Sequence, residues 1–238
     1  MASARPEDAR DAAGLTAASD LGALRDHIGD CHRCALGDTR TQLVFGVGDP
    51  DARLMFVGEA PGKNEDLRGE PFVGAAGKLL DELLESIGLA RSQVYIANIL
   101  KCRPPGNRDP LPPEMASCTP FLARQIELIG PKVIATLGNF ATRYVLDTQR
   151  PISAVRGRLF RAEGRAVVPI FHPAAALYDA SKRDVLFDDF RRLKVVLDRA
   201  EDGTLQVPEQ ADGRLAPEPD GAAGHDAPHI AGRPSGDG

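Results

Sequence analysis

The stretch Arg53-Leu-Met-Phe-Val-Gly-Glu-Ala-Pro-Gly62 decides the fold class of this 238-residue chain. Its first half, residues 53–57, is an almost continuous apolar run, which is typical of a strand buried on both faces of a parallel sheet. Its second half is a turn rich in Gly and Pro, in which the backbone can pass close to a ligand and Glu59 supplies a carboxylate. A buried strand that ends in such a turn is where α/β sheets bind ligands.

Further apolar runs and amphipathic segments alternate along the chain on both sides of this stretch. Apolar runs that predict strands lie at residues 94–97, 133–137 and 167–171. Segments with helical spacing of apolar residues lie at residues 77–87, 113–129 and 139–146. The alternation predicts an α/β fold, a three-layer αβα sandwich around a central, mainly parallel four-stranded sheet.

The two ends of the chain differ from this middle part in composition. Residues 203–238 contain seven Gly, five Pro and no aromatic residue, and residues 1–20 are similarly poor in large apolar side chains. We therefore predict a folded domain at residues 21–202 between disordered segments at 1–20 and 203–238. The ends carry charges of −2 and −4, so the formal charge of −5 leaves the domain near +1, which does not argue against a nucleic-acid partner.

Targeting and membrane signals are not evident in the sequence. The first twenty residues mix Ala, Asp and Arg without an apolar core, unlike a secretory signal. No stretch approaches the roughly 18 to 20 apolar residues that a membrane span needs. We therefore expect a cytoplasmic protein without membrane contact, whose thiols stay reduced.

The cysteines of the chain occur as one C-x2-C pair, Cys31 and Cys34, and two dispersed residues, Cys102 and Cys118. Buried structural thiols, disulfides, redox chemistry and a metal or iron–sulfur site are all compatible with this number. The C-x2-C spacing favours a metal or iron–sulfur site. Zinc more often uses two such pairs, whereas one pair with two dispersed cysteines suits a four-iron cluster, and the spacing alone leaves both open.

Chemically distinctive residues also follow the other predicted strands. Asn98 follows the second strand and His172 the fourth, and Phe72 lies between turn residues where its ring could stack on a planar ligand. Each has an ordinary structural alternative, such as a turn, a helix cap or a core ring. Because carboxyl ends of parallel strands meet at one edge, we expect these residues to converge on one cleft. The P-loop and dinucleotide fingerprints are both absent, so we expect no nucleotide cofactor.

Five motifs taken together closely resemble family 4 uracil-DNA glycosylases, the bacterial and archaeal enzymes that carry an iron–sulfur cluster. The motifs are Gly58-Glu-Ala-Pro-Gly62, Pro71-Phe-Val-Gly74, Asn98-Ile-Leu-Lys-Cys-Arg-Pro-Pro105, Leu137-Gly138 and His172-Pro-Ala-Ala175. The resemblance runs from about residue 31 to residue 197. It implies a monofunctional DNA glycosylase that flips uracil out of single- or double-stranded DNA and hydrolyses its N-glycosidic bond. The product is an abasic site for base-excision repair, and we expect a monomer that acts on nucleoid DNA.

The resemblance also implies roles for individual residues. It implies a structural [4Fe-4S] cluster on Cys31, Cys34, Cys102 and Cys118. The implied uracil pocket consists of Glu59, Ala60, Pro61, Phe72, Asn98 and His172. In that pocket Asn98 would read the base edge and His172 would donate a hydrogen bond to uracil O2. Glu59 would handle the attacking water, with Glu65 as a second acidic candidate.

Residues that would contact the DNA outside the pocket are also predicted. The loop after His172 would enter the minor groove, with Leu177 or its neighbours as the apolar wedge. The basic side chains that could contact phosphate are Arg103, Arg108, Arg156 and Arg158. For each arginine, an ordinary solvated surface position is the alternative.

Four other functions are weighed against this one. A related subclass that is trapped covalently on uracil-DNA has a basic loop ending in His, whereas this chain has Arg103-Pro-Pro-Gly-Asn-Arg-Asp109 without His. A zinc-dependent nucleobase deaminase needs H-x-E and P-C-x-x-C, and neither occurs here. An iron–sulfur electron carrier or a zinc-stabilised DNA-binding module would need no pocket, so Phe72, Asn98 and His172 would be dispensable in it.

Overall fold

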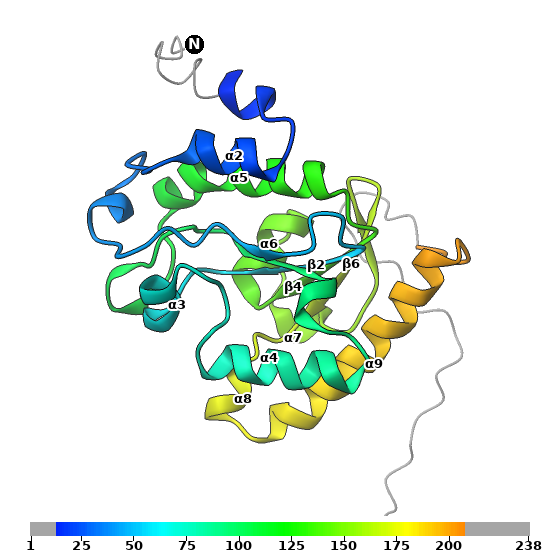
Figure 1. Ribbon diagram of the computed structural model, residues 1–238. Helices are drawn as coiled ribbons and strands as arrows, with labels where there is room; N and C mark the ends of the chain where they lie inside the picture. Colours follow the sequence, from blue (N-terminus) through cyan, green and yellow to red (C-terminus); the bar gives the residue numbers. More distant parts are fainter. Residues whose placement is uncertain (1–12, 208–238) are drawn as a thin grey trace, which may run out of the picture.

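The computed structural model describes residues 13–207, which contain one six-stranded sheet in the order β1-β3-β2-β4-β6-β5 (Figure 1). The four parallel central strands are β3 (Tyr95–Asn98), β2 (Leu54–Gly58), β4 (Val133–Leu137) and β6 (Arg165–Ile170). Two antiparallel strands close the edges, β1 (Val47–Gly48) beside β3 and β5 (Phe160–Ala162) beside β6. The predicted αβα sandwich is confirmed, and its four-stranded sheet is corrected to six strands.

The two strands that the prediction lacked are short, which explains why the sequence pattern did not reveal them. A strand of two or three residues carries no readable alternation of apolar and polar side chains. Gly48 in β1 has a φ of +133°, and a Cβ there would lie 1.9 Å from the Val94 carbonyl oxygen. Backbone contact, rather than burial of side chains, therefore determines this edge.

Helices cover both faces of the sheet. From residue 21 onward, the described α-helices are α2 (Leu21–Ile28), α3 (Lys63–Arg68), α4 (Ala75–Ser86), α5 (Pro112–Ile129), α6 (Asn139–Leu146), α7 (Ile152–Val155), α8 (Ala175–Tyr178) and α9 (Ser181–Glu201). Short 3-10 turns lie at Ala35–Asp38, Arg91–Gln93 and Pro105–Asn107. Figure 1 shows α4 and α9 on one side of the sheet and α5 on the other. The three predicted helices correspond to α4, α5 and α6.

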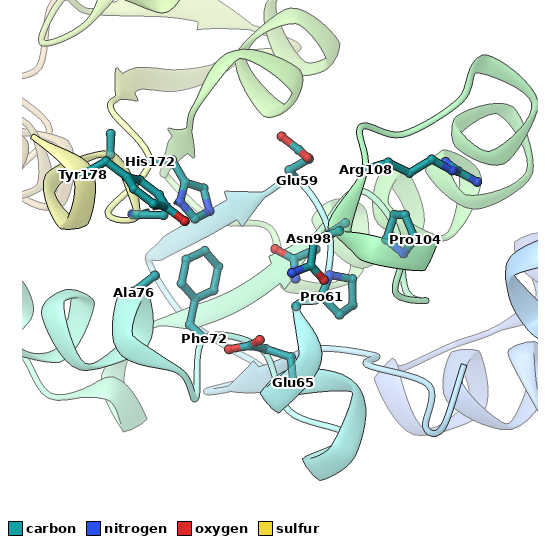
Figure 2. A pocket seen from close by; sticks show the side chains of 15 residues that line it. Glu59, Pro61, Glu65, Phe72, Ala76, Asn98, Pro104, Arg108, His172 and Tyr178 are labelled. Carbon is teal, nitrogen blue, oxygen red and sulfur yellow. Dashed lines mark hydrogen bonds between the residues drawn. The ribbon is translucent and has the colours of Figure 1, made fainter. Parts of the chain in front are cut away.

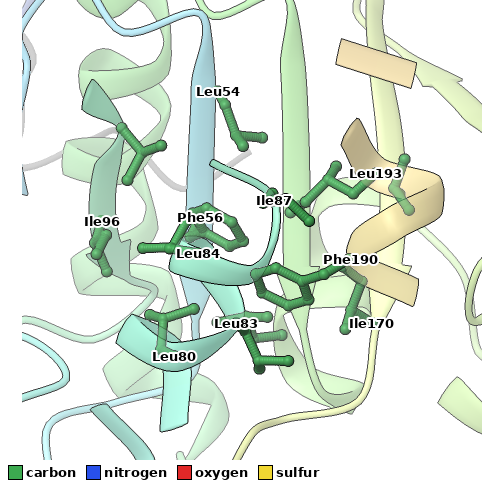
Figure 3. Packing of buried hydrophobic residues seen from close by; sticks show 14 of the residues in the cluster. Leu54, Phe56, Leu80, Leu83, Leu84, Ile87, Ile96, Ile170, Phe190 and Leu193 are labelled. Atoms are coloured by element: carbon green, nitrogen blue, oxygen red, sulfur yellow. The ribbon is translucent and has the colours of Figure 1, made fainter. Parts of the chain in front are cut away.

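The central strand β2 sends alternate side chains into two cores. Leu54 and Phe56 pack with α4 and α9, whereas Met55 and Val57 pack with α5, α6 and α7. Figure 3 shows the first core, where the rings of Phe56 and Phe190 stack with centroids 5.6 Å apart. Such a pair contributes about 0.5–1.5 kcal/mol beyond the area that it buries. Burial on both faces explains the nearly continuous apolar sequence of this strand.

A third, smaller core fixes the N-terminal segment to α5. Leu24 and Ile28 of α2 pack there with Phe45 and Phe121. The carboxylate of Asp20 accepts a hydrogen bond from the Ala23 N–H at 2.8 Å and so caps α2. This packing brings the chain that follows α2, which carries the C-x2-C pair, alongside α5.

The described structure extends past both predicted domain boundaries. Residues 13–17 are helical and Ala18 is buried, although the domain was predicted to begin at residue 21. Leu205 and Val207 pack against the first core, beyond the predicted end at residue 202. The rest of the predicted disordered segments, residues 1–12 and 208–238, lies outside the described residues. Within residues 13–207 no helix combines the length and apolar character that crossing a membrane requires.

Candidate active site

A cavity of about 450 Å³ opens at the carboxyl ends of the central strands (Figure 2). All six residues of the predicted pocket line it: Glu59, Ala60, Pro61, Phe72, Asn98 and His172. The convergence expected from the strand ends is therefore present. The cavity is also lined by Gly62, Glu65, Ala76, Pro104, Asn107, Arg108, Ala174, Ala175 and Tyr178. Its size is in the range of small-molecule sites.

Asn98 presents an unpaired polar atom at this cavity. It is the last residue of β3 and is 2 % exposed, and its side-chain oxygen Oδ1 is buried without a hydrogen-bond partner among residues 13–207. A Cβ on the neighbouring Gly58 would lie 2.3 Å from that oxygen and 2.9 Å from the Phe72 ring. Glycine is therefore needed at the end of β2 for both side chains to approach. An unsatisfied buried acceptor costs about 1–3 kcal/mol, so a ligand that donates a hydrogen bond to this oxygen removes that cost.

The loop before α4 holds the Phe72 ring in the wall of the cavity. Phe72 is buried and has a φ of +54°, a left-handed conformation that costs a non-glycine residue energy. The Glu65 carboxylate accepts hydrogen bonds from the N–H groups of Val73, at 2.9 Å, and Gly74, at 2.8 Å. A Cβ on Gly77 would lie 1.8 Å from the Phe72 carbonyl oxygen. Glu65 thus anchors the loop, whereas the sequence suggested it as a second acidic candidate for handling the water.

His172 presents a neutral ring with a defined tautomer. The Ala174 N–H donates to Nδ1 at 3.1 Å, so the ring proton resides on Nε2. Burial lowers the pKa of His172 to about 4, against an opposing effect of Glu65. The imidazole stacks with the Phe72 ring, with centroids 5.4 Å apart and planes inclined by 25°. Above pH 5 the site therefore has an uncharged N–H donor at a fixed position beside an aromatic face.

Glu59 is the acidic group with the most perturbed titration at the site. Burial and, to a smaller extent, the negative charge of Asp109 together raise its pKa to about 7. Among residues 13–207 its carboxylate has no hydrogen-bond or ion-pair partner. Figure 2 shows Glu59 and Glu65 as separate groups at the cavity. A carboxylate with a pKa near the working pH suits a general base.

Two large exposed side chains stand beside the cavity on α8. Leu177 is 50 % exposed and Tyr178 is 91 % exposed. Of these two, only Tyr178 lines the cavity, although the sequence pointed first to Leu177. The position of Tyr178 depends on the short helix α8, which four residues of sequence do not predict.

The basic residues nearest the cavity lie in the loop before α5. Arg108 lines the cavity and donates two hydrogen bonds, at 3.0 and 2.6 Å, to the buried carboxylate of Glu114. This pairing lowers the pKa of Glu114. Arg103 donates to the Asn107 side chain at 2.7 Å. These contacts order the loop and hold two cations near the rim.

The other two predicted phosphate contacts do not line the cavity. Arg156 donates to both carboxylate oxygens of the buried Asp189, at 2.8 and 2.9 Å, and its guanidinium lies 5.3 Å from the Phe171 ring centroid. The charge of Arg156 is therefore largely compensated within the protein. Arg158 lies two residues further on, after α7, and is half-buried.

The four cysteines are free thiols, and they come from three parts of the chain. Cys31 and Cys34 lie between α2 and the 3-10 turn at Ala35–Asp38, Cys102 follows β3, and Cys118 lies on α5. Burial raises the pKa of Cys102 to about 12 and that of Cys118 to about 11. The charge of Cys31 also raises both pKa values, and the charge of Cys34 raises the pKa of Cys118. The fold therefore gathers all four cysteines into one region.

Hydrogen-bond donors and cations face these sulfurs. The Lys101 backbone N–H donates to Cys118 Sγ at 3.3 Å, and the Arg40 guanidinium lies 3.7 Å from Cys102 Sγ. Among residues 13–207, no group of three or more His, Cys, Asp or Glu side chains is arranged to hold a metal ion. Four cysteine sulfurs with hydrogen-bond donors beside them are a ligand set that suits a [4Fe-4S] cluster.

Comparisons with known proteins agree with this geometry. Residues 45–193 match the family model described as the uracil DNA glycosylase superfamily. The type-4 uracil-DNA glycosylase of Archaeoglobus fulgidus is 49 % identical over 174 residues, which cover 70 % of this chain and 87 % of that protein. The type-4 enzyme of Sulfurisphaera tokodaii is 46 % identical over 180 residues, covering 72 % and 82 % of the two chains. That of Thermotoga maritima is 44 % identical over 175 residues, covering 72 % and 91 %.

Proposed function

The chain belongs to the type-4 family of the uracil-DNA glycosylase superfamily, and we propose that it hydrolyses the N-glycosidic bond of uracil in DNA. The observation that carries the proposal is the buried, unpartnered amide oxygen of Asn98 beside the Phe72 ring and the His172 N–H donor. These three groups match the acceptor, aromatic face and donor that a flipped-out uracil needs.

Asn98 accounts for selection of uracil over cytosine. A base inside a duplex cannot reach such a pocket, so the nucleotide must rotate out of the stack at a cost of a few kcal/mol. The Asn98 Oδ1 then accepts uracil N3–H, and its amide N–H donates to uracil O4. Cytosine presents the reverse pattern at both positions. Each mismatched buried group costs about 1–3 kcal/mol, so cytosine is rejected.

Phe72 and His172 act on the base together. Their rings stack with centroids 5.4 Å apart and planes inclined by 25°, so a base stacked on Phe72 lies beside the imidazole. Stacking of this kind contributes roughly 1–3 kcal/mol. There the His172 Nε2–H donates to uracil O2, where negative charge develops as the C1′–N1 bond breaks. A neutral, fixed donor stabilises that charge without reorganisation.

Glu59 acts on the sugar side of the reaction. Cleavage of the bond gives the sugar oxocarbenium character, as in glycoside hydrolysis. The ionised carboxylate of Glu59 offsets this positive charge and accepts a proton from the attacking water. Its pKa of about 7 makes it half ionised at neutral pH.

The remaining contacts concern the DNA and the products. Leu177 and Tyr178 enter the gap that the flipped nucleotide leaves, as apolar wedges do in other minor-groove binders. Arg103, Arg108 and Arg158 contact phosphates, whereas Arg156 primarily stabilises the fold. None of the described residues that line the cavity is lysine, which favours simple hydrolysis over a Schiff base. The product is thus an abasic site for base-excision repair, made in the cytoplasm by a monomer.

The cysteines hold a [4Fe-4S] cluster in this proposal, with Cys31, Cys34, Cys102 and Cys118 as its ligands. When bound, the cluster supplies a cross-link between the N-terminal segment, the loop after β3 and α5. The hydrogen bond from the Lys101 N–H to Cys118 supports a thiolate at that position. The cysteines brace the site, and the pocket residues carry out the reaction.

An excision assay tests the function directly. The purified chain, with no added metal or nucleotide, is incubated with end-labelled oligonucleotides that contain uracil in a single strand or opposite guanine. We expect strand breaks only after alkali treatment, because hydrolysis leaves an abasic site. Matched oligonucleotides with cytosine or thymine in place of uracil serve as controls. Absence of alkali-sensitive sites at micromolar protein, with cluster absorbance near 400 nm present, would refute the proposal.

A further inference from the structure

Lys101 is a fully buried cation with no part in the chemistry described above. Its side chain is 0 % exposed. The ammonium Nζ donates to the Asn98 backbone carbonyl at 2.8 Å and to Gln125 Oε1 at 2.6 Å. Burying an ammonium costs several kcal/mol unless good acceptors surround it. A lysine in this position therefore requires an explanation beyond packing.

The acceptors of Lys101 are themselves fixed in place. The Gln125 side-chain amide, on α5, donates to the Phe45 carbonyl at 2.9 Å and lies 3.3 Å from the Tyr95 hydroxyl. The Lys101 carbonyl accepts from the Val44 N–H at 2.8 Å. The ammonium is thus held by a rigid frame that joins α5 to the segment before β1.

The other end of this frame is the backbone that carries Asn98. Beyond β3, the N–H groups of Ile99 and Leu100 continue to donate to the carbonyls of Gly58 and Glu59, both at 3.0 Å. The Asn98 carbonyl instead accepts from the Lys101 side chain. Lys101 thereby fixes the peptide group from which the Asn98 side chain projects into the cavity.

We propose that Lys101 is a positioning residue for uracil recognition, which holds the Asn98 amide in register with the base edge through the Asn98 carbonyl. The proposal rests on the function proposed above. Its effect is specific, because Lys101 reaches the base only through Asn98. Loss of the ammonium lets Asn98 shift, and displacements of about 1 Å at a reacting group can cost on the order of 100-fold in rate.

A merely structural role predicts a different pattern. Replacing a buried charge by an apolar side chain of similar volume is often neutral or stabilising, so Lys101→Met need not weaken the fold. A positioning role instead predicts slower excision without loss of stability. It also predicts that the effect disappears once Asn98 can no longer read the base.

A double-mutant cycle tests this coupling. Single-turnover uracil excision is measured for the unsubstituted chain, Lys101→Met, Asn98→Ala and the double variant, with cluster absorbance and thermal unfolding checked for each. We expect Lys101→Met to slow excision about 10- to 100-fold in the unsubstituted chain and less than 2-fold in the Asn98→Ala background. We also expect Lys101→Met to narrow the preference for uracil over cytosine. Equal slowing in both backgrounds would overturn the proposal.

Lys132 offers a matched control, and a second variant guards against misfolding. Lys132 also donates to backbone carbonyls, those of Ala200 and Glu201, and it does not line the cavity. Lys132→Met should leave excision unchanged within 2-fold. If Lys101→Met does not fold, Lys101→Gln enters the same cycle, with the same overturning result. No excision by the unsubstituted chain would instead refute the proposed function, and this inference with it.

Discussion

The pocket at the strand ends and the region around the cysteines differ in how they treat polar groups. In the pocket, the Asn98 amide oxygen is buried without a partner, and the Glu59 carboxylate has none among residues 13–207. Around the cysteines, Arg40 contacts Asp30, the Cys31 carbonyl and the Cys102 sulfur. The pocket is left incomplete for a substrate, whereas the protein itself supplies polar partners around the cysteines. Catalysis and bracing are therefore separable by mutation.

The largest effect on chemistry should come from Asn98→Asp. The substitution removes the amide donor and places a carboxylate against uracil O4, so excision should fall about 1,000-fold, or about 4 kcal/mol. The substitution breaks no hydrogen bond of the side-chain oxygen, which has no partner among residues 13–207. Single-turnover kinetics on uracil- and cytosine-containing strands measure the loss and any gain on cytosine.

Asn139→Asp is the matched control for that change. Asn139 also lies at a strand end, but its side-chain oxygen already accepts from the Ile152 N–H at 2.8 Å, and it does not line the cavity. Asp retains that acceptor, so excision should stay within 2-fold of the unsubstituted chain. Unchanged excision by Asn98→Asp would remove Asn98 from base recognition.

The second effect concerns the region around the four cysteines and should appear as a loss of stability. Cys102→Ser removes one of the four sulfurs and should lower the free energy of unfolding by about 3 kcal/mol, because a structural cluster contributes directly to folding. Excision per folded molecule should change less than 3-fold. Denaturant unfolding and cluster absorbance measure the loss of stability, and activity normalised to folded protein measures the change in excision. Ser117→Ala, beside Cys118, is the control. A stable, fully active variant without cluster would contradict the bracing role.

The third effect is a pH dependence that only the pocket should show. The pKa of Glu59 is about 7, so the ionised fraction of its carboxylate rises about 10-fold from pH 6 to pH 8, and kcat/KM should rise with it. His172, with a pKa of about 4, stays neutral throughout this range, so its titration adds no second pH-dependent change in kcat/KM. Glu59→Gln should be slower and show no limb near pH 7. A flat profile for the unsubstituted chain would exclude Glu59 as the base.

The sequence predicted the central strands and the helices with regular apolar spacing. The run at 133–137 matches β4, which is buried along its whole length, and the helical spacing at 139–146 matches α6. The long helix α9 was not predicted, although Leu186, Phe190, Leu193 and Leu197 repeat at helical spacing. Many charged residues lie between these apolar residues, so the segment is not apolar on average. Only the helical spacing of the apolar residues would have revealed α9.

The site divides in a similar way. Residues at strand ends, such as Asn98 and His172, could be predicted because the sheet itself brings them to one edge. Tyr178 and the anchoring role of Glu65 could not, because they depend on the exact paths of loops. The partner of Arg156 was equally hidden, since Asp189 lies 33 positions away on α9. Contacts between distant irregular segments leave no local pattern.

The smallest effect should come from Glu65→Gln, which bears on how sharply the two regions differ. Glu65 lies at the pocket yet behaves like a bracing residue, since its carboxylate holds the Val73 and Gly74 N–H groups of the loop that carries Phe72. Gln keeps an acceptor oxygen and loses only the charge, which weakens these bonds by about 1 kcal/mol. Excision should therefore fall about 3-fold, with a matching small loss of thermal stability. A loss near that of Asn98→Asp, without any loss of stability, would instead make Glu65 part of the reaction.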